Sequence, residues 1–121
     1  MSQVNKSISQ HNKSIVLASR PVGQPTAENF RLESTAIAPI TEGQVLIKTL
    51  YLSLDPYMRG RMSAAKSYAD PVAIGEVMTA ESAGVVVESK SPLYAVGDHV
   101  CSPSGWQEYF VSEGNDPLTY K

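Results

Sequence analysis

The 121-residue sequence contains a single cysteine, Cys101, so an internal disulfide is impossible and the thiol content fits a reducing compartment. No apolar run approaches the about 20 residues that a helix needs to cross a bilayer. The first fourteen residues are polar and lack the apolar segment of a secretory signal. We therefore expect a cytoplasmic protein without a membrane partner.

The sequence also lacks a large excess of charge of either sign. Ten basic residues oppose twelve acidic ones, which gives a formal net charge of −2. Nucleic-acid and anionic-membrane surfaces are bound by basic patches. The sequence has no such patch, and its one closely spaced basic pair is Arg59 and Arg61. Nucleic acid is therefore not an expected partner.

The sequence has no glycine-rich dinucleotide-binding loop. No G-x-G-x-x-G motif follows a strand and opens a helix, and no strand–helix–strand unit is evident to hold one. The glycines at 23, 43, 60, 75 and 84 are isolated. A Rossmann cofactor domain is therefore expected to be absent from this chain.

The most distinctive segment that is present runs from residue 44 to 62. Its first part, Val45–Leu54, is rich in β-branched, leucine and aromatic residues and predicts the best-buried strand of the protein. Asp55 and Pro56 then end the strand, with Asp55 as a turn cap and Pro56 at the first helical position. A short helical turn that starts near Tyr57 should follow.

The rest of the sequence predicts one mainly β domain over 14–121, preceded by a disordered polar tail over 1–13 that includes a solvated His11. Gly84 suggests a bulge or a close backbone approach within a strand. The spacing of turns favours an antiparallel sheet that is closed or nearly closed. Further strands are predicted over 14–19, 29–36, 75–89 with an irregularity near 81–82, 99–101 and 106–111.

Five blocks in the same order resemble one protein family. The sequence is similar to the N-terminal domain of zinc-independent medium-chain dehydrogenase/reductases, in the branch of leukotriene hydroxydehydrogenases, prostaglandin reductases and plant alkenal reductases. Within that branch the likeness is greatest to bacterial NADPH-dependent curcumin reductases. The blocks are LASRPVGQPTAENFRLE at 17–33, LYLSLDPYMRGRM at 50–62, SYADPVAIGEVM at 67–78, VVESKSPLYAVGDHV at 86–100 and SGWQEYFV at 104–111.

This resemblance implies a GroES-like, partly open antiparallel β-barrel with short helices. It also implies that the whole protein is a homodimer that uses NADPH to reduce the C=C bond of α,β-unsaturated carbonyls, with NADPH held mostly by a second domain. The 121-residue chain alone is then expected to be inert. The alternative is a non-catalytic GroES-like interaction module.

Three aromatic residues are candidates for contacts with substrate. Tyr57 lies where the family's cleft begins, and its phenol would donate a hydrogen bond to the enolate oxygen; the alternative is a half-buried packing tyrosine. Tyr68 aligns with a substrate-contacting tyrosine of some relatives, or is an exposed loop residue. Trp106 would form the floor of an apolar pocket, but residue type favours a core or barrel-mouth aromatic. An apolar patch is expected near these three residues.

Arg59 and Arg61 are two residues apart on the helical turn and cannot both face one ligand. We therefore expect at least one of them to hold the turn to the barrel through backbone carbonyls. A zinc site is not expected, because the resemblance implies that zinc-binding members of the superfamily carry a His-Glu pair after the glycine that matches Gly75, and here Glu76 follows it instead. Moreover, one cysteine and two histidines do not supply the three or four ligands that zinc needs.

Overall fold

The structure, a computed structural model, describes residues 11–63, 71–115 and 118–121. Tyr68 and the first ten residues lie outside this part of the chain. Within it, no helix is long and apolar enough to span a membrane. The elements in order are β1 (His11–Leu17), a 3₁₀ turn (Ala27–Asn29), β2 (Phe30–Ala36), β3 (Val45–Leu52), α2 (Tyr57–Arg61), β4 (Ser82–Ser89), β5 (His99–Ser102) and β6 (Tyr109–Ser112).

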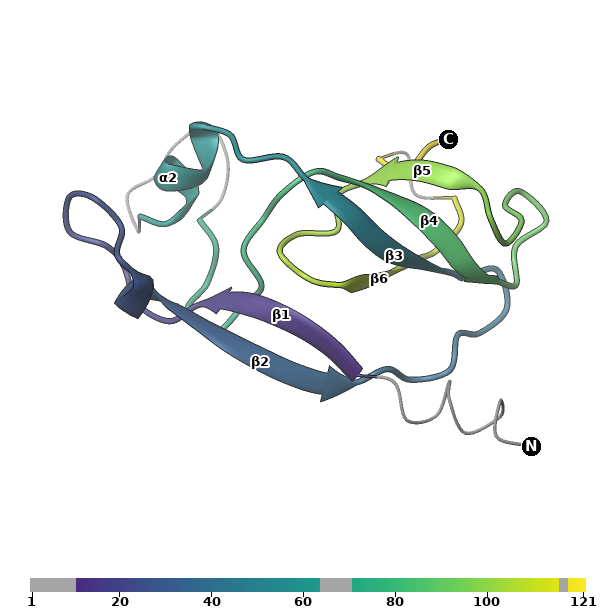
Figure 1. The fold of residues 1–121 in the computed structure, drawn as a ribbon, viewed down its shortest axis with the longest axis horizontal. Coiled ribbons are helices and arrows are strands. Elements are labelled where there is room, and N and C mark those ends of the chain that lie inside the picture. The colour runs from purple at the N-terminus through teal and green to yellow at the C-terminus, as the bar shows by residue number, and fades with distance from the viewer. Residues whose placement is uncertain (1–10, 64–70, 116–117) are drawn as a thin grey trace.

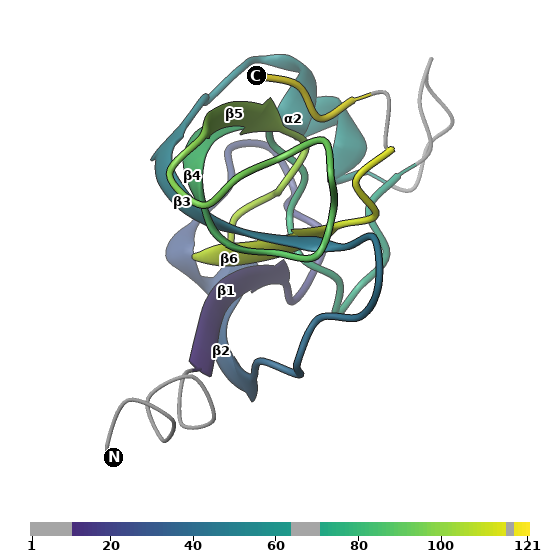
Figure 2. The same cartoon turned by 90° about the vertical axis from the view of Figure 1, so that its right-hand side faces the viewer.

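The strands form two antiparallel sheets. Strands β1 and β2 pair with each other, and the other four pair in the order β5-β4-β3-β6. Figure 1 shows α2 at one end of the molecule, beyond the end of β3, and Figure 2 shows the four-stranded sheet curving above the β1–β2 pair. The sheets do not close into a complete barrel. The predicted mainly β, partly open antiparallel class is therefore confirmed.

Two separate apolar clusters form the core. One joins β1 to α2 and to the chain that precedes β4, and the partly buried Phe30, Tyr57 and Trp106 pack against it. The other lies inside the four-stranded sheet, where Tyr94 and Phe110 cover its margin. The buried members are Leu17, Met58, Met62, Val72, Met78 and Ala80 in the first cluster, and Val45, Ile47, Val86 and Val100 in the second.

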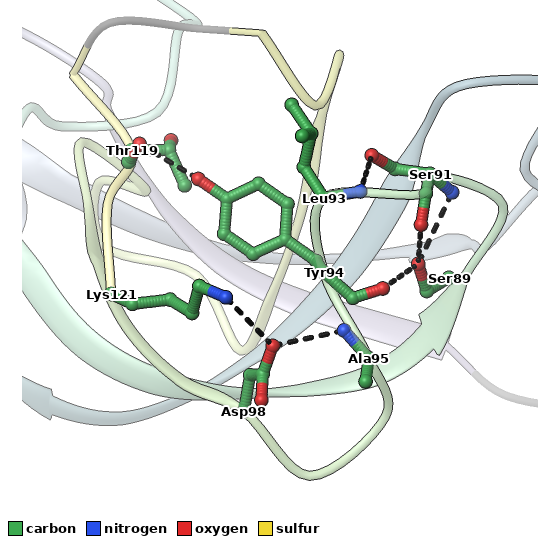
Figure 3. Close-up of polar contacts among 8 residues, drawn as sticks. All are labelled: Ser89, Ser91, Leu93, Tyr94, Ala95, Asp98, Thr119 and Lys121. Atoms are coloured by element: carbon green, nitrogen blue, oxygen red, sulfur yellow. Dashed lines mark hydrogen bonds and ion pairs between the residues drawn. The ribbon is translucent and has the colours of Figure 1, made fainter.

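The C-terminal residues 118–121 lie against β5 and the turn before it. The backbones of Tyr120 and Cys101 exchange hydrogen bonds of 2.7 and 3.0 Å. The Tyr94 hydroxyl donates to the Thr119 carbonyl at 3.0 Å, and the Lys121 ammonium lies 3.7 Å from an Asp98 carboxylate oxygen (Figure 3). These contacts cover part of an edge that β5 would otherwise expose to pairing with other chains.

Several predicted strand boundaries are wrong; β6, for example, begins at Tyr109 rather than at residue 106. Strand β1 begins at His11 rather than residue 14, because a seven-residue ladder with β2 pairs His11 with Ala36; residues 11–13 are therefore not a disordered tail. Strand β4 begins at Ser82 rather than at 75, because Gly75 has a φ of +92° and turns the chain away. The segment after that glycine crosses β1 with one bridge, between Val77 and Val16.

Candidate functional site at the end of strand β3

A β-bulge divides β3 into two halves. Thr49 faces Gly84 on β4 and Tyr51 faces Ala83, so Leu50 is an extra residue with no direct partner. A Cβ atom at Gly84 would collide with the Lys48 carbonyl oxygen. Both interpretations of Gly84, a bulge and a close backbone approach, are therefore confirmed. Bulges occur often beside functional sites because they redirect side chains.

The two halves differ sharply in burial, so the prediction that all of β3 is the best-buried strand is wrong for its second half. Val45, Leu46 and Ile47 are buried, whereas Tyr51 is 75% exposed and Leu54 is 74% exposed. β6 pairs with β3 only as far as Lys48, so beyond that residue β3 pairs with β4 alone among the described strands.

One side of this exposed half forms a pocket of about 310 Å³ against β4, β5 and the C-terminal residues. Its polar groups include the side chains of Ser53, Glu81, Cys101 and Tyr120. The pKa of the Tyr120 phenol is raised, first because negative charge on the Cys101 sulfur repels a phenolate, and second because the two side chains hydrogen-bond.

Buried hydroxyl groups lie beneath the same pocket. The Ser82 and Ser104 hydroxyls are 2.6 Å apart, and the Ser102 hydroxyl is 3.4 Å from that of Ser82. The Thr49 hydroxyl donates to Ser104 at 3.4 Å. Buried hydroxyls need such partners, because an unpaired one loses its hydration without compensation. The network joins β3 to β4 and β5 where the strand emerges from the sheet.

The other side of β3 forms a more open and more apolar pocket of about 600 Å³. Trp106 lines it and also contacts Phe30, with ring centroids 5.4 Å apart. The indole N–H of Trp106 is buried and has no hydrogen-bond acceptor among the described residues. Trp106 thus lies between a core cluster and a pocket, and its role in substrate binding stays a prediction. The apolar lining residues are Ile15, Leu32, Leu50, Leu52, Leu54 and Trp106.

Tyr57 is the first residue of α2 and is half-buried against the first core cluster. It lines neither of these two pockets, and the Asp55 carboxylate accepts from the Ser53 hydroxyl at 2.7 Å instead of capping α2. Tyr57 and Trp106 thus pack against the same core cluster, but of the two only Trp106 lines a pocket beside β3. Tyr68 lies outside the described residues.

Arg59 has the structural role that the sequence predicted for at least one of the two arginines. Its guanidinium donates to the Gly23 and Pro21 carbonyls at 3.1 and 3.2 Å and to the Ser63 hydroxyl at 2.9 Å. Sequence reasoning missed Tyr51 and Tyr120, whose side chains line the smaller pocket. Tyr51 lies between Leu50 and Leu52 in a predicted strand, and this alternation already indicated that its side chain points to the opposite face from theirs. Tyr120 comes to the pocket only through tertiary structure.

No group of three or more His, Cys, Asp or Glu side chains in the described part of the chain is arranged to hold a metal ion. His99 and Cys101 share one face of β5, since they are two residues apart. The Glu76 carboxylate accepts from the Ala73 backbone N–H at 3.3 Å. The described residues also provide no strand, glycine loop and helix for a dinucleotide, because every ladder between their strands is antiparallel.

Comparison with known proteins identifies the family. Residues 13–119 match the family model described as the N-terminal domain of oxidoreductase. The chain belongs to this family. The matched range holds Tyr57, Tyr68, Trp106 and all of β3 through β6.

Individual relatives agree with this assignment. The chain is 57% identical over 107 residues to NADPH-dependent curcumin reductase of Escherichia coli, covering 88% of this chain and 31% of that protein. It is 39% identical over 104 residues to prostaglandin reductase 1 of Bos taurus, and the match covers 86% of this chain and 30% of that protein. The crystal structure of CurA in complex with NADPH from Vibrio vulnificus superposes with a TM-score of 0.82 at 52% identity, covering 85% and 31%. The chain thus spans about a third of the length of these relatives.

The exposed half of β3 leads to a prediction about association. We expect the 121-residue chain to self-associate, since the exposed Leu50, Leu52 and Leu54 line one open apolar pocket together with Trp106. This surface includes Trp106, one of the three residues near which an apolar patch is predicted. Replacing Leu54 with Lys should weaken self-association about tenfold or more, because the exposed leucine no longer gains from burial. Sedimentation equilibrium measures the dissociation constant of self-association for each variant.

The matched control for this experiment is Val22→Lys. Val22 is 97% exposed in the loop after β1, far along the chain from β3, and its replacement adds the same charge. Self-association should remain unchanged in this variant. A wild-type chain that stays monomeric at high concentration, or equal weakening by both substitutions, would contradict the prediction.

Proposed function

We propose that this chain is the substrate-side domain of an NADPH-dependent oxidoreductase that reduces the C=C bond of α,β-unsaturated carbonyls. The observation that carries the proposal is the 57% identity, over 107 residues, with a protein named NADPH-dependent curcumin reductase. Identity to prostaglandin reductase 1 supports the same reaction class. On this proposal the fold is GroES-like and the enzyme works without zinc.

NADPH supplies a hydride to the β-carbon of the substrate when it is bound. The described residues offer no dinucleotide-binding loop, so we assign the cofactor site to a separate domain of the whole protein. What this chain contributes is the other wall of the cleft. A hydrogen-bond donor there stabilises the enolate oxygen, where negative charge develops.

Tyr57 is the proposed donor. It is a phenol at the first residue of a short helix, immediately after a rigid strand and the Asp55–Pro56 turn. Its half-buried ring is fixed by packing against the first core cluster, which would hold the hydroxyl in one direction. Tyr68 and Trp106 are proposed to contact the apolar part of the substrate.

The proposal extends to partners and location. The substrate is a small unsaturated carbonyl compound, and the whole protein is a cytoplasmic homodimer that binds neither nucleic acid nor membrane. The net charge of −2 supports the absence of a nucleic-acid or membrane partner. The single cysteine supports the cytoplasmic location.

The activity of the isolated chain provides a direct test. We expect the 121-residue chain to oxidise no NADPH in the presence of an enone, because the described residues offer the cofactor no binding loop. The full-length protein should oxidise NADPH with the same enone, as followed by the loss of absorbance of the reduced nicotinamide. Turnover by the isolated chain would contradict the two-domain arrangement. A full-length protein that is inert with every enone tried would favour a non-catalytic interaction module.

A further inference from the structure

Arg20 and α2 are joined by hydrogen bonds that run in both directions. Nη1 of Arg20 donates to the carbonyls of Met62 and Val72, at 2.9 Å each. In return, Arg59 of α2 donates to the carbonyls of Pro21 and Gly23, which lie in the loop that Arg20 begins. Each arginine therefore holds the backbone of the segment that carries the other.

The carbonyls that Arg20 binds are groups that a short helix leaves without a partner. Met62 is the C-cap of α2, and the last carbonyls of a helix lack partners within the helix. A cation placed there also matches the partial negative charge at the helix C-terminus. Val72 lies ten residues later, and its N–H donates to the Arg61 carbonyl at 2.8 Å. Arg20 thus ties two separate chain segments at the end of α2.

Helix α2 depends on such external support. It has five residues, and helices this short are not stable on their own. Met58 and the C-cap residue Met62 are buried in the first core cluster, so packing anchors one face of the helix and other contacts help to resist its rotation. The described contacts that resist rotation are the reciprocal arginine bonds and the half-buried ring of Tyr57.

We propose that Arg20 is a positioning residue for the reaction: it fixes the orientation of α2 and therefore the direction of the Tyr57 hydroxyl. This inference rests on the proposed function, in which Tyr57 faces the substrate. Both printed hydrogen bonds of the Arg20 guanidinium go to backbone carbonyls at the end of α2, so we assign it an action through α2 and not a contact with the substrate. Displacing a catalytic donor by about 1 Å lowers the rate about 100-fold, so a residue that only positions the donor can have a large effect on kcat.

The test uses the full-length protein with Arg20→Ala and Arg20→Lys, and Arg31→Ala as the control. Arg31 is an exposed arginine on β2 whose side-chain hydrogen bonds go to Glu33. Replacing it with alanine therefore removes the same charge as Arg20→Ala without affecting α2. We expect Arg20→Ala to lower kcat for enone reduction about tenfold or more, with the KM for NADPH unchanged. Arg20→Lys, which retains the cation, should recover most of the loss, and Arg31→Ala should match wild type.

Hydrogen exchange separates this inference from the proposed function. In Arg20→Ala the Val72 amide should exchange about tenfold faster or more, since the charge-assisted bonds beside it are lost. The Ile15 amide, which bonds the Trp106 carbonyl, should be unaffected. If the wild-type protein reduces no enone while Val72 exchange rises as expected, the proposed function fails and the positioning of α2 stands.

Two outcomes would overturn the inference. One is unchanged Val72 exchange in Arg20→Ala, which would show that the guanidinium does not hold α2. The other is faster exchange with kcat unchanged in an active enzyme, which would show that α2 does not orient a reacting group. Should Arg20→Ala fail to fold, Arg20→Gln keeps an amide donor and is judged by the same two measurements.

Discussion

Replacing Tyr57 with Phe should reduce kcat/KM of the full-length protein for an enone by about 100-fold, without unfolding it. The substitution removes one hydroxyl and keeps the ring that packs against the first core cluster, so stability should change little. The loss should appear in kcat, because the donor is needed where charge develops on the carbonyl oxygen during reaction. Steady-state kinetics at saturating NADPH measures it.

Tyr51→Phe is the matched comparison. Tyr51 is a second phenol near the end of β3, but its side chain lines the smaller pocket with Cys101 and Tyr120. On the present proposal its hydroxyl can be removed without loss of rate. The reverse pattern, in which Tyr51→Phe loses activity and Tyr57→Phe keeps it, would reject Tyr57 as donor and place the reaction at the smaller pocket.

Replacing Gly84 with Ala should lower the free energy of unfolding of the 121-residue chain by about 3 kcal/mol. The added Cβ would meet the Lys48 carbonyl oxygen and would lie 2.9 Å from Cγ2 of Ile47. Both belong to the neighbouring strand at its bulge, so the backbone itself has to move. For a chain of this size the melting temperature should fall by about 10 °C or more, as measured by circular dichroism.

Gly60→Ala is the control for this prediction. Gly60 lies in α2, and a Cβ atom there has no neighbour within 4 Å. Because alanine favours helix over glycine by about 0.5–1 kcal/mol, this variant should be as stable as wild type or slightly more so. Equal stability of the Gly84 and Gly60 variants would mean that the two strands separate at the bulge without cost.

The sequence predicted the local features that depend on few neighbours. The Asp55–Pro56 stop, the short turn after it and the close approach at Gly84 all follow from the limited backbone freedom of proline and the missing side chain of glycine. The carbonyl-binding role of an arginine in α2 was predicted too, because two arginines at that spacing cannot share one ligand.

Burial along β3, in contrast, could not be predicted from the sequence. Residues 45–54 look equally apolar in sequence, and hydrophobic character alone predicts that all of them are inside. Only the structure shows that β6 stops pairing at Lys48 and that the strand beyond it is exposed. Whether an apolar strand is covered depends on the length of its neighbour, which is set by distant turns.

The amino-acid sequence by itself determined the β-rich class, the turn at 55–57 and the family, because composition, turn residues and ordered motifs are properties of the chain alone. Tertiary structure decided which residues share a pocket, that Tyr57 and Trp106 pack against one core cluster, and that Arg20 reaches the end of α2. Hydrogen bonds in the folded chain join residues up to 97 positions apart, such as Asn12 and Tyr109, and only the folded chain brings such residues together.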